Sequence, residues 1–374
     1  MANNVKKVNT IAIADIGKVN GQNDTDLAKL NGEEFTGVVP DWKGSRAIIG
    51  GGWAYNAAGS GQSVISILYK TLVSDVDTSD FGDLAAAKQV FTGSGSNGTT
   101  VVMGGGSSYP ASGGSSYTTV TIDYMTAASV GTVGDAGDLD QTSREGSNQG
   151  ASNGTLCFFV GGHFGSSPYN LDSMQQMTIS STGGASGAGD IQGGATSKHT
   201  TSNGDTKFLI MGIGTAEAAK TAIDTHDFDT SGDSSAYGSV ATIAMGRTAS
   251  VSATNRVVTG GGYVQFGPTI IGTRMSFFPV ASNADGDSSD EADLVVGAAG
   301  HGATSNGTRG EFYGGFASSS DGYAQNDIQK ITIASLANSS DVGDLTTPEF
   351  ASGSQYSTGD IYGMSGCSAQ TAIN

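Results

Sequence analysis

The chain is organised by a glycine cluster that ends an apolar stretch and returns six times at a nearly constant spacing. The clusters begin at Gly50, Gly104, Gly161, Gly212, Gly260 and Gly314, so the spacing stays between 48 and 57 residues. A "GDL"-like motif keeps the same spacing, with its acidic residue at Asp83, Asp138, Asp190, Asp293 and Asp344. So does an "SNG" motif at Asn97, Asn153, Asn203 and Asn306, with "SATN" and "STG" in the remaining places. A period of this length indicates one supersecondary unit copied along the chain.

Each unit has the pattern of several short β-strands. Runs such as "YTTVTIDYMT" and "DIQKITIAS" alternate between apolar and polar residues, which is typical of half-buried strands. The glycine of "SNG" provides the positive φ that a hairpin turn requires, and "GDL" is interpreted as a second turn. Helix-forming patterns are confined to "DLAAAKQV" near Leu84 and "GTAEAAKTAI" near Ala216. The sequence therefore predicts an all-β protein, a β-propeller of four-stranded antiparallel blades.

The number of blades depends on the two ends of the chain. Six units occupy residues 46–359, which leaves an N-terminal segment 1–45 and a C-terminal segment 360–374. The tail contains "DIYGMSG", the form of a strand after an "SNG" turn, while "TIAIAD" and "TDLAKLNG" near the N-terminus resemble the next strand and turn. We therefore favour seven blades, with the last shared between the termini and 360–374 closing the ring, because this protects exposed strand edges. The alternative is six blades with 1–45 as a separate anchor.

Composition excludes several classes of partner. Thirty-five acidic residues against seventeen basic ones give a formal charge of −18, which opposes contact with nucleic-acid phosphates. Two cysteines, Cys157 and Cys367, do not make a disulfide framework and fit a reducing cytoplasm. The N-terminus lacks the apolar run of a signal peptide, and no stretch approaches the ~20 apolar residues of a membrane span. We expect no nucleic-acid partner and no membrane insertion.

The sequence offers no pattern of catalytic, cofactor-binding or metal-ligating residues, so we expect a protein that is not an enzyme and needs no cofactor. The histidines fall in different units without ligand spacing and are expected on the surface or in loops; they are His163, His199, His226 and His301. Acidic stretches at 224–233 and 283–293 could offer oxygen ligands to calcium, but they lack EF-hand spacing, and solvated loops are the favoured interpretation. The Asn-Gly-Thr triplets recur with the repeat and are interpreted as hairpin turns, not glycosylation acceptors.

Aromatic residues gather in the loops that follow the glycine clusters. These loops should emerge on one rim of the propeller, where aromatic rings could stack on sugars or anchor a protein interface. Covering the blade ends is the alternative role for the same rings. The candidate binding rim comprises Trp53, Tyr55, Tyr109, Tyr117, Phe164, Tyr169, Tyr263 and Phe266.

The glycine doublet after an apolar strand, the "TI" strand that follows it and a "GDL" motif with a nearby basic residue, Lys88 or Arg144, resemble the repeats of kelch-like propellers. The tryptophan expected in a kelch unit is missing. The short duplication "IGKVNG" and "LAKLNG" at 16–21 and 27–32, with the Gly/Ser/Thr-rich units, is similar to segments of virion structural proteins of tailed bacteriophages.

That second resemblance implies a tail or baseplate appendage or a capsid decoration, assembled in the host bacterial cytoplasm. Its expected partners are other virion proteins and host cell-surface glycans or proteins, with self-association into a homo-oligomer left open. The alternative is a carbohydrate-active enzyme or oxidase on a kelch-like propeller, because propellers carry unrelated functions.

Overall fold

The computed structural model describes a β-rich chain that divides into two units, Met1–Asp41 and Trp42–Asn374. The described residues of the second unit are 46–55, 61–88, 93–108, 117–127, 129–131, 133–140, 150–163, 170–192, 199–202, 206–213, 222–239, 248–253, 256–265, 270–279, 289–298, 301–315, 325–335 and 337–346. In the first unit only the paired residues of three hairpins are described.

The first unit contains three hairpins of two-residue strands. Their lysines Lys7, Lys18 and Lys29 each begin the first strand of a hairpin. The strands are β1 (Lys7–Val8), β2 (Ile11–Ala12), β3 (Lys18–Val19), β4 (Gln22–Asn23), β5 (Lys29–Leu30) and β6 (Glu33–Glu34), paired in consecutive order. The predicted seventh blade is therefore wrong. The structure has the six blades of the alternative, the described N-terminal strands pair with one another, and the segment 360–374 lies outside the described residues.

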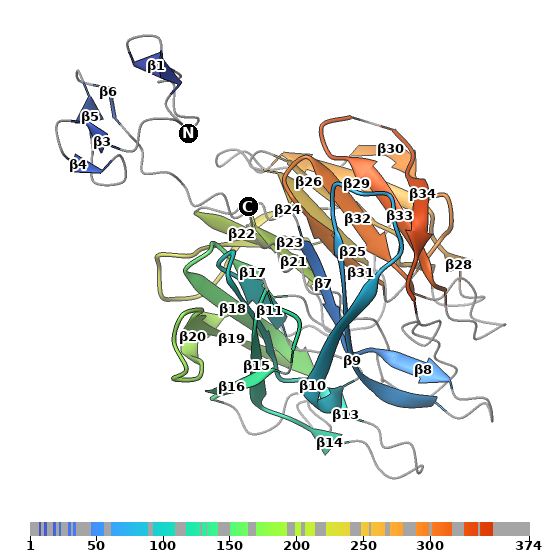
Figure 1. Cartoon of the computed structure of the whole chain (residues 1–374), viewed down its shortest axis with the longest axis horizontal. Helices are drawn as coiled ribbons and strands as arrows, with labels where there is room; N and C mark the ends of the chain where they lie inside the picture. The colour runs from blue at the N-terminus through green and yellow to red at the C-terminus, as the bar shows by residue number, and fades with distance from the viewer. Residues whose placement is uncertain are drawn as a thin grey trace. The chain divides into compact units, whose positions relative to one another are not determined.

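The second unit is a six-bladed β-propeller of antiparallel sheets. Strands are ordered from the innermost to the outermost along each sheet (Figure 1). Blade 1 contains β7 (Arg46–Gly50), β9 (Gly61–Thr71) and β10 (Ser79–Lys88), with β8 (Trp53–Tyr55) paired to the start of β9. Blade 2 contains β11 (Gly93–Ser96), β12 (Thr100–Gly104), β15 (Thr121–Thr126) and β16 (Gly134–Asp138), with the added hairpin β13 (Ser107–Ser108) and β14 (Tyr117–Thr118). The second helix-like stretch, near Ala216, lies outside the described residues, and the first is wrong because Leu84 lies in β10.

The remaining blades follow the same order along the chain. Blade 3 contains β17 (Ala151–Ser152), β18 (Leu156–His163), β19 (Asn170–Thr178) and β20 (Ser186–Asp190). Blade 4 contains β21 (His199–Ser202), β22 (Lys207–Ile213), β23 (Ala222–Asp227) and β24 (Ser235–Ser239). Blade 5 contains β25 (Ala249–Ala253), β26 (Arg256–Gly260), β29 (Arg274–Pro279) and β30 (Ser289–Asp293), with β27 (Tyr263–Gln265) and β28 (Ile270–Ile271). Blade 6 contains β31 (Gly302–Ser305), β32 (Arg309–Tyr313), β33 (Asp327–Thr332) and β34 (Ser340–Asp344).

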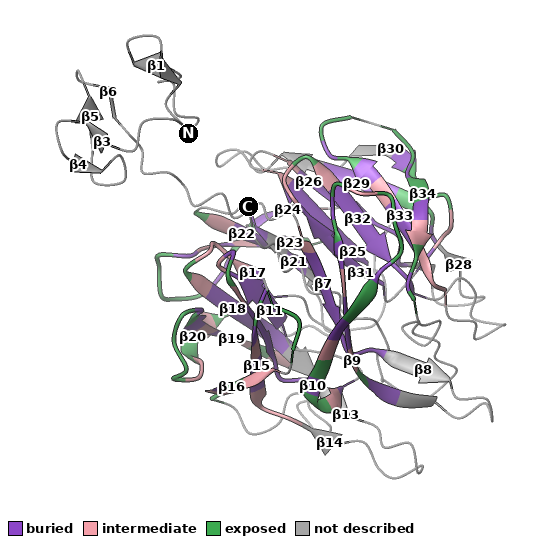
Figure 2. Ribbon diagram, in the orientation of Figure 1, coloured by how far each residue is buried: buried purple, intermediate pink, exposed green. Residues whose placement is uncertain are grey.

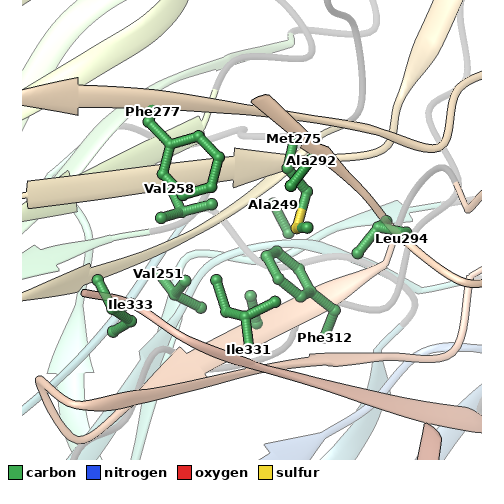
Figure 3. Close-up of a cluster of buried hydrophobic side chains, with 11 residues drawn as sticks. Ala249, Val251, Val258, Met275, Phe277, Ala292, Leu294, Phe312, Ile331 and Ile333 are labelled. Atoms are coloured by element: carbon green, nitrogen blue, oxygen red, sulfur yellow. The ribbon is translucent and has the colours of Figure 1, made fainter. Parts of the chain in front are cut away.

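The core lies between neighbouring blades (Figure 2). Between blades 5 and 6, Val251, Val258 and Phe277 from one sheet pack with Phe312 and Ile331 from the next (Figure 3). Alternation along each middle strand sends side chains to both neighbouring blades in turn, which is why these strands are buried on both faces. Each blade is thus stabilised by its two neighbours.

The "SNG" motif forms the turn between the first and second strands, as predicted. In blade 2, the Asn97 side-chain oxygen accepts hydrogen bonds from the backbone N–H groups of Thr99 (3.0 Å) and Thr100 (2.7 Å). Gly98 supplies the positive φ of 90°. The same bonds recur at Asn153 and Asn306.

The "GDL" motif is not a turn, which corrects the interpretation from the sequence. Its glycine and acidic residue lie inside the outermost strand, at a bulge in the pairing with the third strand. Gly189 has φ +125°, and a Cβ there would lie 1.9 Å from the Gly232 carbonyl oxygen of the next blade. The motif therefore marks a close approach between blades.

Candidate functional site: the hairpin rim and the joints beneath it

Hairpins that extend the second and third strands form one face of the ring, which we call the hairpin rim. They comprise β8 with the start of β9, β13 with β14, the outer parts of β18–β19 and β22–β23, and β27 with β28. The turns between the first and second strands lie at the opposite ends of the strands. Inner-strand serines at those opposite ends bond to one another around the ring: Ser152 Oγ lies 3.4 Å from the Ser96 carbonyl, and Ser202 Oγ 2.8 Å from the Ser152 carbonyl. The blades consequently share one orientation, and their hairpins share one face.

In blades 1 and 5, a pair of glycines lies between the end of the second-strand position and the rim hairpin. Gly261 has φ +71°, and a Cβ there would lie 2.2 Å from the Ala298 carbonyl oxygen, on the segment that returns from the outermost strand. The next residue, Gly262, donates its N–H to the same carbonyl at 2.7 Å. The equivalent bond in blade 1 runs from Gly52 N–H to the Lys88 carbonyl at 2.8 Å. The predicted glycine clusters of blades 1 and 5 are therefore joints between the rim and the returning chain.

The structure places half of the predicted rim residues. The backbones of Trp53 and Tyr55 lie in β8, that of Tyr117 in β14 and that of Tyr263 in β27, so they belong to rim hairpins of blades 1, 2 and 5. The other predicted rim residues lie outside the described residues: Tyr109, Phe164, Tyr169 and Phe266.

In blades 3, 4 and 6, a buried polar side chain of the third strand accepts a hydrogen bond from a backbone N–H group of the preceding blade. In blade 3, Gln175 Oε1 accepts the N–H of Asp140 at 2.7 Å. In blade 4, Asp224 Oδ2 accepts the N–H of Gln192 at 3.2 Å. In blade 6, Gln329 Oε1 accepts the N–H of Val296 at 3.1 Å. This set, which the sequence analysis missed, becomes recognisable once the third strands of the units are aligned.

Blade 2 makes the same joint with an ion pair. The Lys88 ammonium, 2 % exposed, donates to Asp123 Oδ2 at 2.7 Å and to the Thr121 carbonyl at 3.2 Å. Burial lowers the pKa of Lys88, and the Asp123 carboxylate opposes that shift. The basic residue near the "GDL" motif is thus a buried structural cation.

Charged residues also hold blade 6 against blade 1. Lys70 Nζ lies 3.2 Å from Glu311 Oε2, and both side chains are fully buried. Glu311 also accepts hydrogen bonds from Arg309 Nε and Tyr313 Oη, each at 2.7 Å. Burial lowers the pKa of Lys70 and raises that of Tyr313. We call these four residues the seam cluster.

Two histidines are buried, contrary to the sequence expectation. His226 lies among Phe158 and Phe208 with its Nε2 3.1 Å from the Gly232 carbonyl, and burial lowers its pKa. His301 packs near Phe312, and neither of its ring nitrogens has a hydrogen-bond partner of ordinary geometry among the described residues. Burial lowers the pKa of His301 to about 4, with partial opposition from the Gly260 backbone.

The acidic stretch 224–233 also differs from a solvated loop, because its first residues lie in β23 and the Asp224 carboxylate is buried. Ser234 Oγ donates to that carboxylate at 2.6 Å. Among the described residues, no three His, Cys, Asp or Glu side chains are grouped in a way that could hold a metal ion. Within the same residues, no helix has the length and apolar character needed to span a membrane.

Comparisons with known proteins give a fold and no family. The sequence matches no family model and no curated protein. Solved structures do match, among them one described as the structure of YjhT, with a TM-score of 0.53 and 12% identity over 70% of this chain and 86% of that one. A likeness at that identity concerns the fold alone. What the chain shares with YjhT is the β-propeller architecture.

Proposed function

We propose that this chain is a structural protein of a tailed-phage particle, a tail or baseplate appendage or a capsid decoration, whose hairpin rim binds partner proteins or host cell-surface glycans. The observation that carries the proposal is that the residues that hold neighbouring blades together are different from the residues of the rim hairpins. Side chains at the joints hold the blades together, while the hairpins extend beyond the glycine pairs. A frame of this kind can present variable contact residues without changing its own packing.

The aromatic content of the rim supports a binding role. Trp53 and Tyr55 lie on one hairpin and Tyr263 on another, and aromatic residues supply most of the energy in both sugar-stacking and protein interfaces. The glycine pairs that end the second strands favour a kelch-like repeat within the propellers. The proposed role is binding without catalysis.

The small unit at 1–41 is a second feature that supports a role in an assembled particle. Its hairpins begin at Lys7, Lys18 and Lys29, so the segment that carries the phage-like duplication is itself a short repeat. We infer that this unit attaches the protein to other virion proteins, after assembly in the host bacterial cytoplasm.

Immunoelectron microscopy tests the virion role. Antibodies raised against the purified ring should decorate particles that carry the protein, at the tail, the baseplate or the capsid surface. Mass spectrometry of gradient-purified particles is the matching measurement. Absence of the chain from purified particles would contradict the proposal.

Binding by the rim is tested with host cells and their purified surface polysaccharides, scoring both retention and cleavage. Trp53→Ala and Tyr263→Ala should reduce retention by roughly tenfold or more, as expected for aromatic anchors. The control is Val130→Ala, because Val130 is exposed on the turn between the third and fourth strands of blade 2, at the opposite face. Glycan cleavage by the wild-type chain would favour the carbohydrate-active enzyme instead.

A further inference from the structure

The connections between second and third strands carry almost no charge. Each one begins and ends at a pair of backbone-paired residues, such as Gly52 with Val64 in blade 1. Bounded in this way, the connections span 52–64, 106–119, 162–171, 213–222, 262–272 and 315–325. The charged residues in these stretches are Glu217, Lys220 and Asp321. None of the residues that the structure describes in them carries a formal charge at pH 7, in a chain of net charge −18.

The charged residues of the ring lie in other parts of the blades. Acidic residues lie in the outermost strands, as at Asp138. The Arg46 guanidinium donates to the Ala127 carbonyl of the next blade at 2.7 Å, and that of Arg256 donates to the Ile333 carbonyl at 3.1 Å. Basic residues begin four of the second strands, at the face opposite the rim: Arg46, Lys207, Arg256 and Arg309. The rim hairpins thus have the uncharged composition that is typical of the centre of a binding interface.

The hairpin of blade 1 places two aromatic residues opposite very small ones. Its register pairs Tyr55 with Gly61 and Trp53 with Ser63. Alternation puts Trp53 and Tyr55 on the same face of the hairpin, with their Cα atoms roughly 7 Å apart along β8. An aromatic residue stabilises a hairpin most when a large side chain stands opposite it. Cross-strand packing therefore does not account for these two aromatic positions.

The hairpin of blade 2 has the same arrangement. Tyr117 of β14 is paired with Ser108 of β13. Blade 5 differs, because Ile271 stands opposite Tyr263 and is the large partner expected of a hairpin selected for its own packing. Blades 1 and 2 therefore carry the aromatic positions that most clearly require another explanation.

The hairpins of blades 1 and 2 are joined to one buried residue, Lys88. Its carbonyl accepts the N–H of Gly52, directly before β8, at 2.8 Å, and its ammonium donates to the carbonyl of Thr121, shortly after β14, at 3.2 Å. The strand that ends at Lys88, β10, contacts β13 and lies beside it in Figure 1. The two hairpins are therefore neighbours on a common base, so one extended ligand can reach both.

The chemistry of the hairpins distinguishes between classes of ligand. Aromatic rings stack on the apolar faces of sugar rings, and serine, threonine, asparagine and glutamine side chains exchange hydrogen bonds with hydroxyl groups. Anionic glycans are bound by arginine and lysine, which are missing from the described rim residues, and the net charge of −18 repels polyanions. Protein interfaces also draw much of their binding energy from arginine. These features together favour an uncharged glycan.

We propose that one uncharged glycan chain binds across the hairpins of blades 1 and 2 and that its sugar rings stack on Trp53, Tyr55 and Tyr117. This ligand class rests on the binding role proposed above for the rim.

Fractionated host polysaccharide tests the ligand class. Surface polysaccharide is separated by anion exchange into an uncharged and an acidic fraction, and each is immobilised and titrated with the full-length chain. The uncharged fraction should bind, with a Kd that changes less than about twofold between about 10 mM and 0.5 M sodium chloride, because no charges need screening. Binding confined to the acidic fraction, or a tenfold loss of affinity in salt, would overturn the proposal.

Substitutions on the two faces of the blade 1 hairpin test the stacking positions. Trp53→Ala and Tyr117→Ala should each weaken binding to the uncharged fraction by roughly tenfold, while Trp53→Phe retains most of it. The matched control is Gln62→Ala, because Gln62 pairs with Ala54 on the other face of the same hairpin and should change the Kd less than about twofold. Equal losses for Gln62→Ala and Trp53→Ala would contradict the stacking assignment.

Tryptophan fluorescence reports on the same face without a binding-site substitution. The chain has two tryptophans, so Trp42→Phe leaves Trp53 as the only one. The uncharged fraction should shift the Trp53 emission to shorter wavelength, as expected when a sugar ring replaces water over the indole. Emission that stays the same at saturating ligand would rule out stacking at Trp53.

Treated host cells separate the failure of this inference from the failure of the rim's binding role. Retention of the chain on cells should be lost after periodate oxidation of their glycans and should survive protease treatment. Retention that protease abolishes and periodate spares would overturn the glycan while leaving the rim as a protein-binding surface. An absence of retention on untreated cells would contradict both proposals.

Discussion

The buried charges of the seam cluster show how single residues can determine the stability of a joint between blades. Glu311 receives hydrogen bonds from Arg309 and Tyr313 besides the Lys70 ion pair, while Lys70 has the Glu311 carboxylate as its charged partner. Removing one member of a buried pair leaves the other without compensation, which is more costly than the pair itself is favourable.

We predict that Glu311→Gln destabilises the ring by about 3 kcal/mol or more, because the Lys70 ammonium stays buried without its counter-charge. Lys70→Met should cost less, since Glu311 keeps Arg309 and Tyr313. The control is Lys330→Met, which breaks an exposed ion pair to Asp75 and should cost under about 1 kcal/mol. Urea unfolding of the three variants measures the loss of unfolding free energy in each. Equal losses for Glu311→Gln and Lys330→Met would contradict the prediction.

His301 predicts a loss of stability in mild acid. Its folded-state pKa of about 4 lies below the usual 6.5, so the unfolded chain binds the extra proton first as the pH falls. The stabilising contribution is present above pH 6.5 and is lost as the pH falls toward 4, by up to about 3 kcal/mol. His301→Leu loses no hydrogen bond of ordinary geometry among the described residues and should flatten this part of the curve of unfolding free energy against pH. An unchanged slope in His301→Leu would assign the effect to other groups.

At the scale of the strand, the bulge in the outermost strand is the element that lets neighbouring blades approach closely. Gly189 holds a positive φ there, with the Gly232 carbonyl where a side chain would begin. Gly187 lies in the same strand, is exposed and has no atom within 4 Å of a Cβ placed on it.

Gly189→Ala should therefore destabilise the protein by about 2 kcal/mol or more, through both backbone strain and the clash with blade 4. Gly187→Ala should be neutral within about 0.5 kcal/mol. Thermal unfolding of the pair provides the comparison. Similar melting temperatures for both variants would mean that the bulge is not tightly packed.

Elements that depend on local sequence were predictable, and elements that depend on neighbouring blades were not. The "SNG" turn is confirmed at Asn97 because its bonds lie within four residues. The "GDL" motif was misread as a turn because the reason for its glycine is a carbonyl on another blade, some forty residues away in the case of Gly189 and Gly232. His301 was expected on the surface or in a loop because its burial depends on contacts from the next unit, such as the one with Phe312. The seventh blade was predicted from strand-like patterns near the N-terminus, "TIAIAD" and "TDLAKLNG", whose described residues pair locally in the hairpins that begin at Lys7 and Lys29.

At the scale of the whole molecule, the acidic charge opposes the compactness of the ring. At the joint of blades 6 and 1 the carboxylate of Asp344, in the outermost strand of blade 6, lies near those of Asp327, Asp77 and Asp341. Burial and this repulsion raise the pKa of Asp344, so the stability it contributes is present at low pH and is lost as the pH rises through its folded value. Exposed carboxylates on edge strands also oppose edge-to-edge association.

Salt should consequently stabilise the protein. Raising sodium chloride from about 10 mM to 0.3 M screens exposed carboxylates and should raise the melting temperature by a few degrees. Asp344→Asn should raise the melting temperature slightly at low salt, by an amount that corresponds to a few tenths of a kcal/mol for an exposed group, and should reduce the response to salt. Calorimetry at both salt concentrations measures this, and a melting temperature that falls with salt would contradict it.

The separation of joints from rim hairpins has a consequence for how this protein can diverge. The connection from Gly104 to Thr121 in blade 2 is longer than that from Tyr313 to Asp327 in blade 6, yet both blades keep the same joints. Insertions and point changes in these connections should therefore have little effect on the stability of the fold, although they change the surface that a partner contacts. Selection for recognition of a changing partner could therefore replace rim residues one at a time while the blades and their joints stay the same. A library randomised only between the glycine pairs and the third strands should accordingly contain mostly folded variants.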